Sequence, residues 1–114
     1  MSILTDMDFV LSGLGIPYFT GVFKGNAPDT YMVIVPLTDS FAVHGDNTPE
    51  YDIQEVRLSL YSKGNYLKHK NALVSRLLSM GFTITERRYI GYETETGYHH
   101  YAVDVANYYE IQEE

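Results

Sequence analysis

The four histidines are the residues of this sequence best suited to bind a metal ion or to carry a proton near neutral pH. His99 and His100 are adjacent in a predicted strand, so their side chains point to opposite faces and cannot easily chelate one ion. His69 falls on the polar side of a predicted helix, and His44 falls in a predicted loop. No pair has the spacing of a zinc site, so we predict neither a metal site nor a cofactor.

The carboxylates do not form a catalytic pattern either. Glu93 and Glu95 fall in a predicted hairpin turn, and Asp6 and Asp8 fall in the first turn of a predicted helix, where the helix dipole favours negative charge. No nucleophile has a recognisable base, no Gly-x-Ser-x-Gly element is present, and no glycine-rich segment opens a helix as a phosphate loop does. We therefore predict that the chain is not an enzyme.

Asp104 differs from the other carboxylates because it lies inside a predicted strand. We expect it to be partly buried and to form an ion pair with Arg87, Arg88 or a residue of a neighbouring subunit. A structural ion pair is a commoner role for such a residue than acid–base catalysis.

Composition narrows the function further. The chain has 114 residues, a formal net charge of −7, no cysteine, and 11 tyrosines without a tryptophan. The acidic balance argues against binding to a phosphate backbone, so we predict no specific DNA binding. The lack of cysteine excludes disulfides and fits a reducing cytoplasm. The tyrosines indicate either subunit interfaces or simply many strands, since tyrosine favours both.

The hydrophobic periodicity predicts an alternation of helices and strands. Strict alternation around Val56, Leu58 and Leu60 predicts the clearest strand. Apolar residues at helical spacing predict two helices, the first with an apolar face of Met7, Val10, Leu11 and Leu14 and the second with an apolar stripe of Leu67, Leu73, Val74, Leu77 and Leu78. Thr5 and Asn65 are the predicted helix caps. The predicted elements are a helix at about 5–14, strands at 18–23, 30–36 and 51–62, a helix at 65–80, and strands at 82–92 and 98–109.

Residues 37–50 are mostly polar, and we predict a long loop there, although Phe41 and Val43 could form a short strand. Strands 18–23 and 30–36 are expected to pair as a hairpin, as are the last two strands. The predicted fold class is α+β, with a mixed, mainly antiparallel sheet of about four to five strands and two helices in a single domain, 1–114. No signal peptide and no apolar segment of membrane-spanning length is seen.

Three segments carry a family resemblance. They are the strand end and helix start at Val56–Tyr66 (VRLSLYSKGNY), the helix end at Leu78–Phe82 (LSMGF), and the hairpin at Tyr92–His100 (YETETGYHH). Together they resemble the tail-terminator and tail-completion proteins of bacteriophages and prophages, over Tyr51 to about Val105. Arg57 departs from the family pattern, which often has an acidic or polar residue there.

The resemblance implies a structural virion protein with a tail-terminator-like fold. Such proteins form a ring, typically a homohexamer, at the head-proximal end of a finished tail tube. The implied partners are other copies of the chain, the tail tube protein and the head connector or stopper protein, with DNA only passing through. The implied location is the host cytoplasm during assembly and then the tail of the virion or of a tail-like particle.

We predict that the interface residues lie in the long loop and among the tyrosines. The loop is expected to be mobile in the free subunit and to order at assembly. The predicted interface residues are Phe41, Val43, His44, Asp46, Asn47, Tyr61, Tyr98 and Tyr108.

Two alternatives remain open at this point. The chain could be a head-completion or stopper protein of the same head–tail joining region, which would differ only in the neighbour it binds. It could also be a small ligand-binding or regulatory module outside any virus, with the tyrosine-bearing sheet as its binding face.

Overall fold

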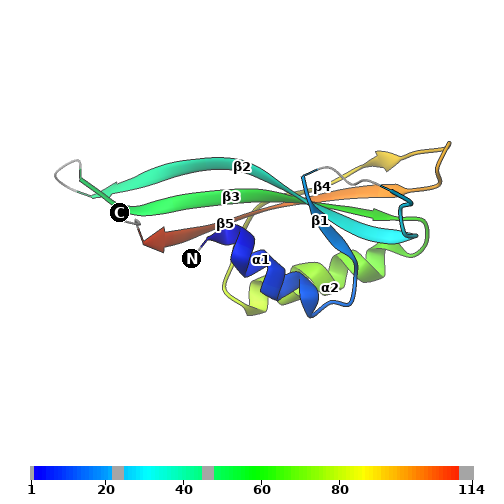
Figure 1. The fold of residues 1–114 in the computed structure, drawn as a ribbon, viewed down its shortest axis with the longest axis horizontal. Coiled ribbons are helices and arrows are strands. Elements are labelled where there is room, and N and C mark those ends of the chain that lie inside the picture. The colour runs from blue at the N-terminus through cyan, green and yellow to red at the C-terminus, as the bar shows by residue number, and fades with distance from the viewer. Residues whose placement is uncertain (1, 22–24, 45–47, 111–114) are drawn as a thin grey trace.

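The fold is built on long strands with two helices along one side (Figure 1). The computed structural model describes residues 2–21, 25–44 and 48–110, with the side chains of 38–44 and 48–50 left aside. Its elements are α1 (Ile3–Ser12), β1 (Tyr18–Thr20), β2 (Thr30–His44), β3 (Thr48–Ser62), α2 (Tyr66–Ser79), β4 (Thr83–Tyr92) and β5 (His99–Glu110). The predicted α+β class, with two helices and a mixed sheet, is confirmed.

Helix α1 begins two residues earlier than predicted. Ser2 is its N-cap in place of Thr5, because the Ser2 Oγ accepts a hydrogen bond from the Thr5 N–H at 3.3 Å. The predicted apolar face is confirmed, since Met7, Val10 and Leu11 are fully buried. Burial of these three side chains removes apolar surface from water and holds α1 against the sheet.

The sheet has the order β1-β2-β3-β5-β4, and the predicted hairpin of strands 18–23 and 30–36 is wrong. Strand β1 pairs with β2 in parallel, with Tyr18 opposite Met32, while every other pair is antiparallel. The pattern of strand formers predicted that both strands exist. It could not predict their direction, because residues 21–29 are longer than a tight hairpin turn and can return the chain either way.

The predicted loop at 37–50 is also wrong. Residues 37–44 continue β2 and residues 48–50 begin β3, so the two strands form one long antiparallel hairpin. Its ladder contains register shifts between Pro36 and Thr38 and between Ala42 and Val43. These irregularities break the strict alternation of apolar and polar residues, which is why the segment resembled a loop.

Helix α2 is capped as predicted, because the Asn65 Oδ1 accepts a hydrogen bond from the Lys68 N–H at 3.2 Å. Leu73 and Leu77 are fully buried in the core. Leu67 and Leu78, which were predicted to share this stripe, are 49% and 58% exposed. The buried stripe is therefore narrower than predicted.

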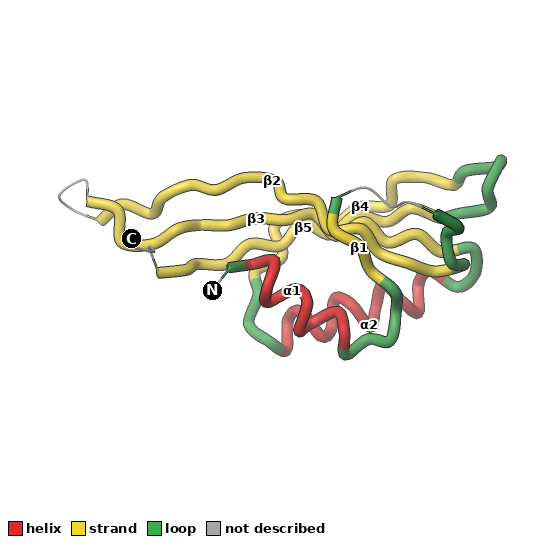
Figure 2. The backbone as a smooth tube through the Cα atoms, in the orientation of Figure 1, coloured by secondary structure: helices red, strands yellow, loops and turns green. Residues whose placement is uncertain are grey.

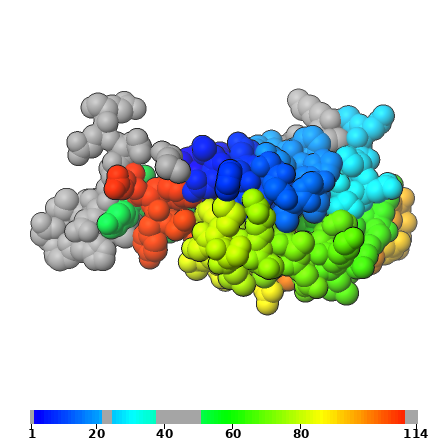
Figure 3. Space-filling view, turned by 90° about the horizontal axis from the view of Figure 1, so that it is seen from below, coloured from blue at the N-terminus to red at the C-terminus, as the bar shows by residue number. Residues whose placement is uncertain are grey.

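Both helices lie against the same face of the sheet (Figure 2). The core lies between them and the inward side chains of the strands, among them Ile34, Leu58 and Val103. The molecule measures 53 × 26 × 24 Å, and β2, β3 and β5 extend beyond the helices at one end (Figure 1). Seen from the helix side, α1 and α2 cover the sheet, and the end of β5 lies beyond them (Figure 3). We call this extension, residues 37–44, 48–55 and 107–110, the arm, and the rest of the described chain the body.

Candidate functional site

The sheet face that no helix covers, which we call the open face, carries an aromatic cluster at the body end. The ring of Tyr61 stacks on Tyr31 at 4.9 Å and on His100 at 4.3 Å between centroids. These residues are cross-strand neighbours on β2, β3 and β5, and this is the placement in which aromatic side chains pack on a sheet. Tyr98 packs edge-on against both Tyr31 and Tyr61.

Tyr98 closes this cluster against solvent. Its hydroxyl donates a hydrogen bond to the Pro28 carbonyl oxygen at 2.5 Å, and the Lys63 ammonium lies 5.0 Å from the centre of its ring. Tyr98 is consequently buried, which the prediction of an exposed interface tyrosine did not foresee. The cluster covers one end of the open face with the chain's own residues.

His100 is the chemically unusual member of the cluster. Its Nε2 atom is buried and has no hydrogen-bond partner within the described part of the chain. Burial lowers the pKa of His100, the nearby Glu93 carboxylate opposes that shift, and Arg57 adds to it. His99 points to the other face, as its neighbouring position in the strand predicted.

A bidentate ion pair lies at the centre of the open face. The Arg57 Nε donates to Asp104 Oδ1 at 2.8 Å and the Arg57 Nη2 donates to Asp104 Oδ2 at 3.1 Å. The Asp104 side chain is 9% exposed and that of Arg57 is 33% exposed. Burial of Asp104 and its pairing with an arginine agree with the prediction, but the partner is Arg57 rather than Arg87 or Arg88.

This pair belongs to a small polar network. Thr85 donates to the Glu55 carboxylate at 2.5 Å and to the Asp104 carbonyl oxygen at 3.3 Å. Thr85 lies at a register shift in β4, between Ile84 and Glu86, and the shift directs it toward β3. The centre of the open face is therefore polar and largely satisfied, and it is not an apolar docking patch.

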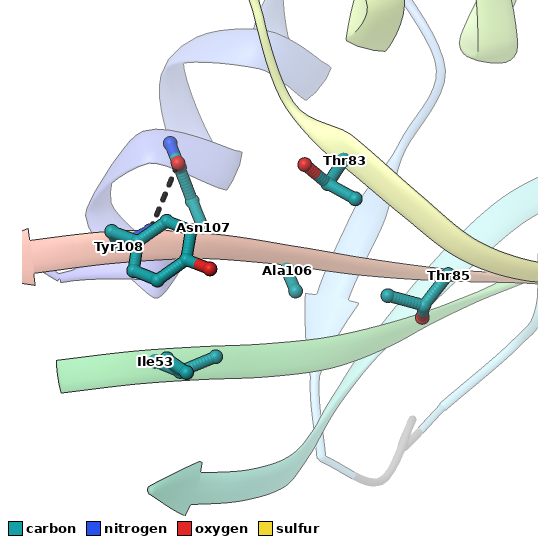
Figure 4. Close-up of a pocket in the computed structure, with 6 residues that line it drawn as sticks. All are labelled: Ile53, Thr83, Thr85, Ala106, Asn107 and Tyr108. Carbon is teal, nitrogen blue, oxygen red and sulfur yellow. Dashed lines mark hydrogen bonds between the residues drawn. The ribbon is translucent and has the colours of Figure 1, made fainter. Parts of the chain in front are cut away.

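A shallow hollow of about 200 Å³ marks the root of the arm (Figure 4). It lies where β4 begins and the β3–β5 pair continues without it. Tyr108, beside it, is 61% exposed, and its ring lies edge-on to Tyr51 at 6.3 Å. The residues that line the hollow are Ile53, Thr83, Thr85, Ala106, Asn107 and Tyr108.

A second aromatic cluster lies on the helix-bearing face, beside the edge strand β4. The ring of Tyr66 lies 5.0 Å from His99 and 5.2 Å from Tyr89, and Tyr92 lies 4.8 Å from His99. The Tyr89 hydroxyl and the His99 Nδ1 are 2.9 Å apart and share a hydrogen bond. Tyr89 and Tyr92 remain about half exposed, so this cluster presents rings to solvent.

The predicted interface residues do not form one site. Tyr61 and Tyr98 meet at the body end of the open face, and Tyr108 lies at the root of the arm. Phe41, Val43 and His44 fall in the arm part of β2. Asp46 and Asn47 lie outside the described residues.

Three of the residues that organise the open face were missed as site residues, namely Tyr31, Arg57 and His100. The register supplies the signal that could have found them, because Tyr31 lies opposite Tyr61, Tyr61 opposite His100, and Arg57 opposite Asp104. The register can be known only when it is known which strands pair, and hydrophobic periodicity alone does not identify the pairs.

The described residues include no group of three or more metal-ligating side chains. No helix in that part of the chain is long and apolar enough to cross a membrane. A scan against protein-family models finds no match, and a search of curated proteins finds none either.

Proposed function

We propose that the chain is a structural subunit of a phage or phage-like tail. In this proposal it forms a ring, most simply a hexamer, at the head-proximal end of the tail tube, ends polymerisation of the tube and joins the tail to the head. It acts by steric blocking and docking, without catalysis. Its partners are other copies of itself, the tail tube protein and the head connector, while DNA passes without specific contact.

The observation that carries this proposal is the arm. Three strands continue past the helices, and in the arm each outer strand lacks a neighbour among the described residues. Strand β1 pairs only with Met32–Ile34 of β2, and β4 pairs with β5 only up to Ala106. Strands with unpaired edges associate readily with other chains, so an arm of this kind suits a subunit that works in an assembly.

The arm also changes the mechanism that the sequence suggested. A mobile loop would lose conformational entropy when it orders at assembly, whereas residues already paired as strands have lost most of it on folding. Apart from two register shifts, the described part of the arm is paired, so it is preorganised for docking. The proposed subunit therefore reaches its partner with a preformed hairpin.

The test is to shorten the hairpin without disturbing the body. Phe41 and Asp52 are opposite each other in the ladder, so residues 42–51 can be replaced by a two-residue Asn-Gly turn that joins them. Electron microscopy of particles made with this variant should show overlong tubes without heads, as in a deletion of the gene. Tails of normal length with heads attached would refute the proposal for the arm.

A matched control changes the hairpin tip at the opposite end of the molecule. Replacing Glu93 and Glu95 by glutamine alters an exposed turn and leaves the arm intact. This variant should give tails of normal length. If the gene deletion itself gave normal tails and heads, the proposed function would fail altogether.

A further inference from the structure

Charge is segregated along this chain in a way that follows the fold. Residues 57–88, which run from the middle of β3 through α2 and most of β4, contain seven of the eight lysines and arginines and one acidic residue. Residues 25–56 and 89–114 contain twelve acidic residues and no lysine or arginine. The basic residues are thus concentrated in one continuous segment, which has an acidic segment on either side of it in the sequence.

Aromatic surface is exposed at the body end, where the basic region meets the first residues of the segment that follows it. Around the second aromatic cluster, Lys70 lies 5.6 Å from the ring of Tyr101, and Arg87 lies two residues before Tyr89 on the exposed strand β4. We call this surface the α2–β4 flank, made of Tyr66, Leu67, Lys70, Arg87, Tyr89 and Tyr92. It combines exposed rings with positive charge, which is the composition of a protein interface core with a charged rim.

The acidic region exposes apolar surface on the arm. The rings of Tyr51 and Tyr108 pack edge to face beside the hollow, and Glu110 lies directly opposite Tyr51 in the β3–β5 ladder. We call this surface the arm face, made of Tyr51, Ile53, Tyr108 and Glu110. Tyr51 is 40% exposed, so both rings are available to a partner.

The arm face and the α2–β4 flank lie at opposite ends of the long axis of the molecule and so cannot contact each other within one copy (Figure 1). From their opposite charge and their matching exposed rings, we propose that the arm face of one copy docks on the α2–β4 flank of the next. Such a contact joins two different surfaces and is head-to-tail. Repetition of a head-to-tail contact gives a ring when the rotation between copies closes.

This inference rests on the proposed function only in that it specifies how the ring subunits meet, and it can be tested without tubes or phage. Sedimentation velocity of the purified chain, at concentrations up to the millimolar range, should show self-association at low salt. In 1 M NaCl the association should weaken, because the Debye length falls from about 10 Å at 0.1 M to about 3 Å.

Charge reversal on either surface should weaken the association about tenfold or more, since like charges facing each other cost several kcal/mol and 1.4 kcal/mol corresponds to tenfold. The arm variant is Glu110→Lys, and the flank variant is Lys70→Glu. A mixture of the two variants should associate again, because each arm then meets a flank of opposite charge. Circular dichroism of each variant establishes that it is folded.

A control variant, Asp8→Lys, makes the same charge change as the arm variant but on neither surface. It should associate like the wild type. If the wild type associates but the mixture of variants does not, the proposed contact is wrong, whereas the proposal that copies of the chain form a ring is not contradicted. If the wild type stays monomeric at every concentration and salt, the proposed head-to-tail contact is wrong. Normal tails with heads after gene deletion would be a separate result, and that result would refute the proposed function.

Discussion

The body and the arm are made from the same three strands but are held together differently. In the body, Ile34, Leu58 and Val103 direct fully buried side chains toward the helices. In the arm, Tyr51 and Tyr108, on the same β3 and β5, stay substantially exposed. The difference follows the two faces of the sheet, because Tyr51 and Tyr108 alternate with helix-facing residues such as the buried Tyr109 and so lie on the open face, whereas both helices cover the other face (Figure 2).

The body and the arm are therefore stabilised by different interactions. The body is stabilised by burial of apolar area, at about 25 cal/mol per Å². The arm is stabilised by its backbone ladder and by cross-strand pairs such as Tyr51 with Tyr108, which contribute about 0.2–1 kcal/mol each. Two anchors join the regions, because the Ile3 N–H donates to Gln54 Oε1 at 2.9 Å and the Tyr109 hydroxyl donates to Asp6 Oδ2 at 2.6 Å.

The largest contrast is expected between core and arm truncations. Leu58→Ala in the body should lower the free energy of unfolding by about 2–5 kcal/mol, because it leaves a cavity in a packed core. Tyr51→Ala in the arm should change it by no more than about 0.5 kcal/mol, as for other exposed positions. Urea denaturation of both variants measures this, and equal losses would show that the arm is part of the cooperative core.

The ion pair on the open face should give the next largest effect. Arg57→Ala leaves the buried Asp104 carboxylate without its bidentate donor, and we expect a loss of about 1–3 kcal/mol. Arg57→Ala combined with Asp104→Ala should recover part of this loss, since no unpaired charge then remains. A double variant that is less stable than the single one in urea denaturation would contradict this account.

Tyr98→Phe tests whether the aromatic cluster is closed by its hydrogen bond. The change keeps the ring packed on Tyr31 and Tyr61 but removes the donor to the Pro28 carbonyl oxygen, which should cost about 0.5–1.5 kcal/mol. Thermal unfolding monitored by circular dichroism measures it. Tyr92→Phe, on the exposed second cluster, serves as the control and should leave the midpoint unchanged.

The smallest effect is expected from the titration of His100. Its folded-state pKa lies below the ordinary value near 6.5 because of burial, so the unfolded chain takes up a proton more readily than the folded one. The stability that this residue contributes is therefore fully present above the unfolded pKa and is lost as pH falls below it. His100→Gln should remove this part of the pH dependence, and an unchanged slope of unfolding free energy between pH 7 and 5 would count against the assignment.

The sequence predicted the elements of the body well because helical and strand periodicity survive wherever one face is buried. Met7 and Val10 follow helical spacing, and Val56 with Leu58 follows strand alternation, and all four are fully buried. The arm part of β2 was predicted poorly because its ladder with β3 shifts register twice, which interrupts the alternation of apolar and polar residues.

The candidate site was predicted only in part for a related reason. Individual residues such as Tyr61 and Asp104 were identified by type, but their partners are set by pairing between strands far apart in the sequence. Arg57 lies opposite Asp104 across 47 positions of the chain, and the same type of contact joins Tyr61 to His100. A pattern confined to neighbouring residues cannot specify such contacts.

The irregular edge strand β4 has a consequence for how copies of this molecule can meet. Its ladder is interrupted between Ile84 and Glu86 and again between Tyr89 and Gly91, and it carries the charged pair Arg87 and Arg88. Bulges and charges of this kind make an edge a poor template for another strand. A neighbouring copy that approaches β4 therefore has to contact its side chains and cannot add a strand to the sheet there. As a result, we expect that the protein does not grow into fibres through this edge, even at high concentration.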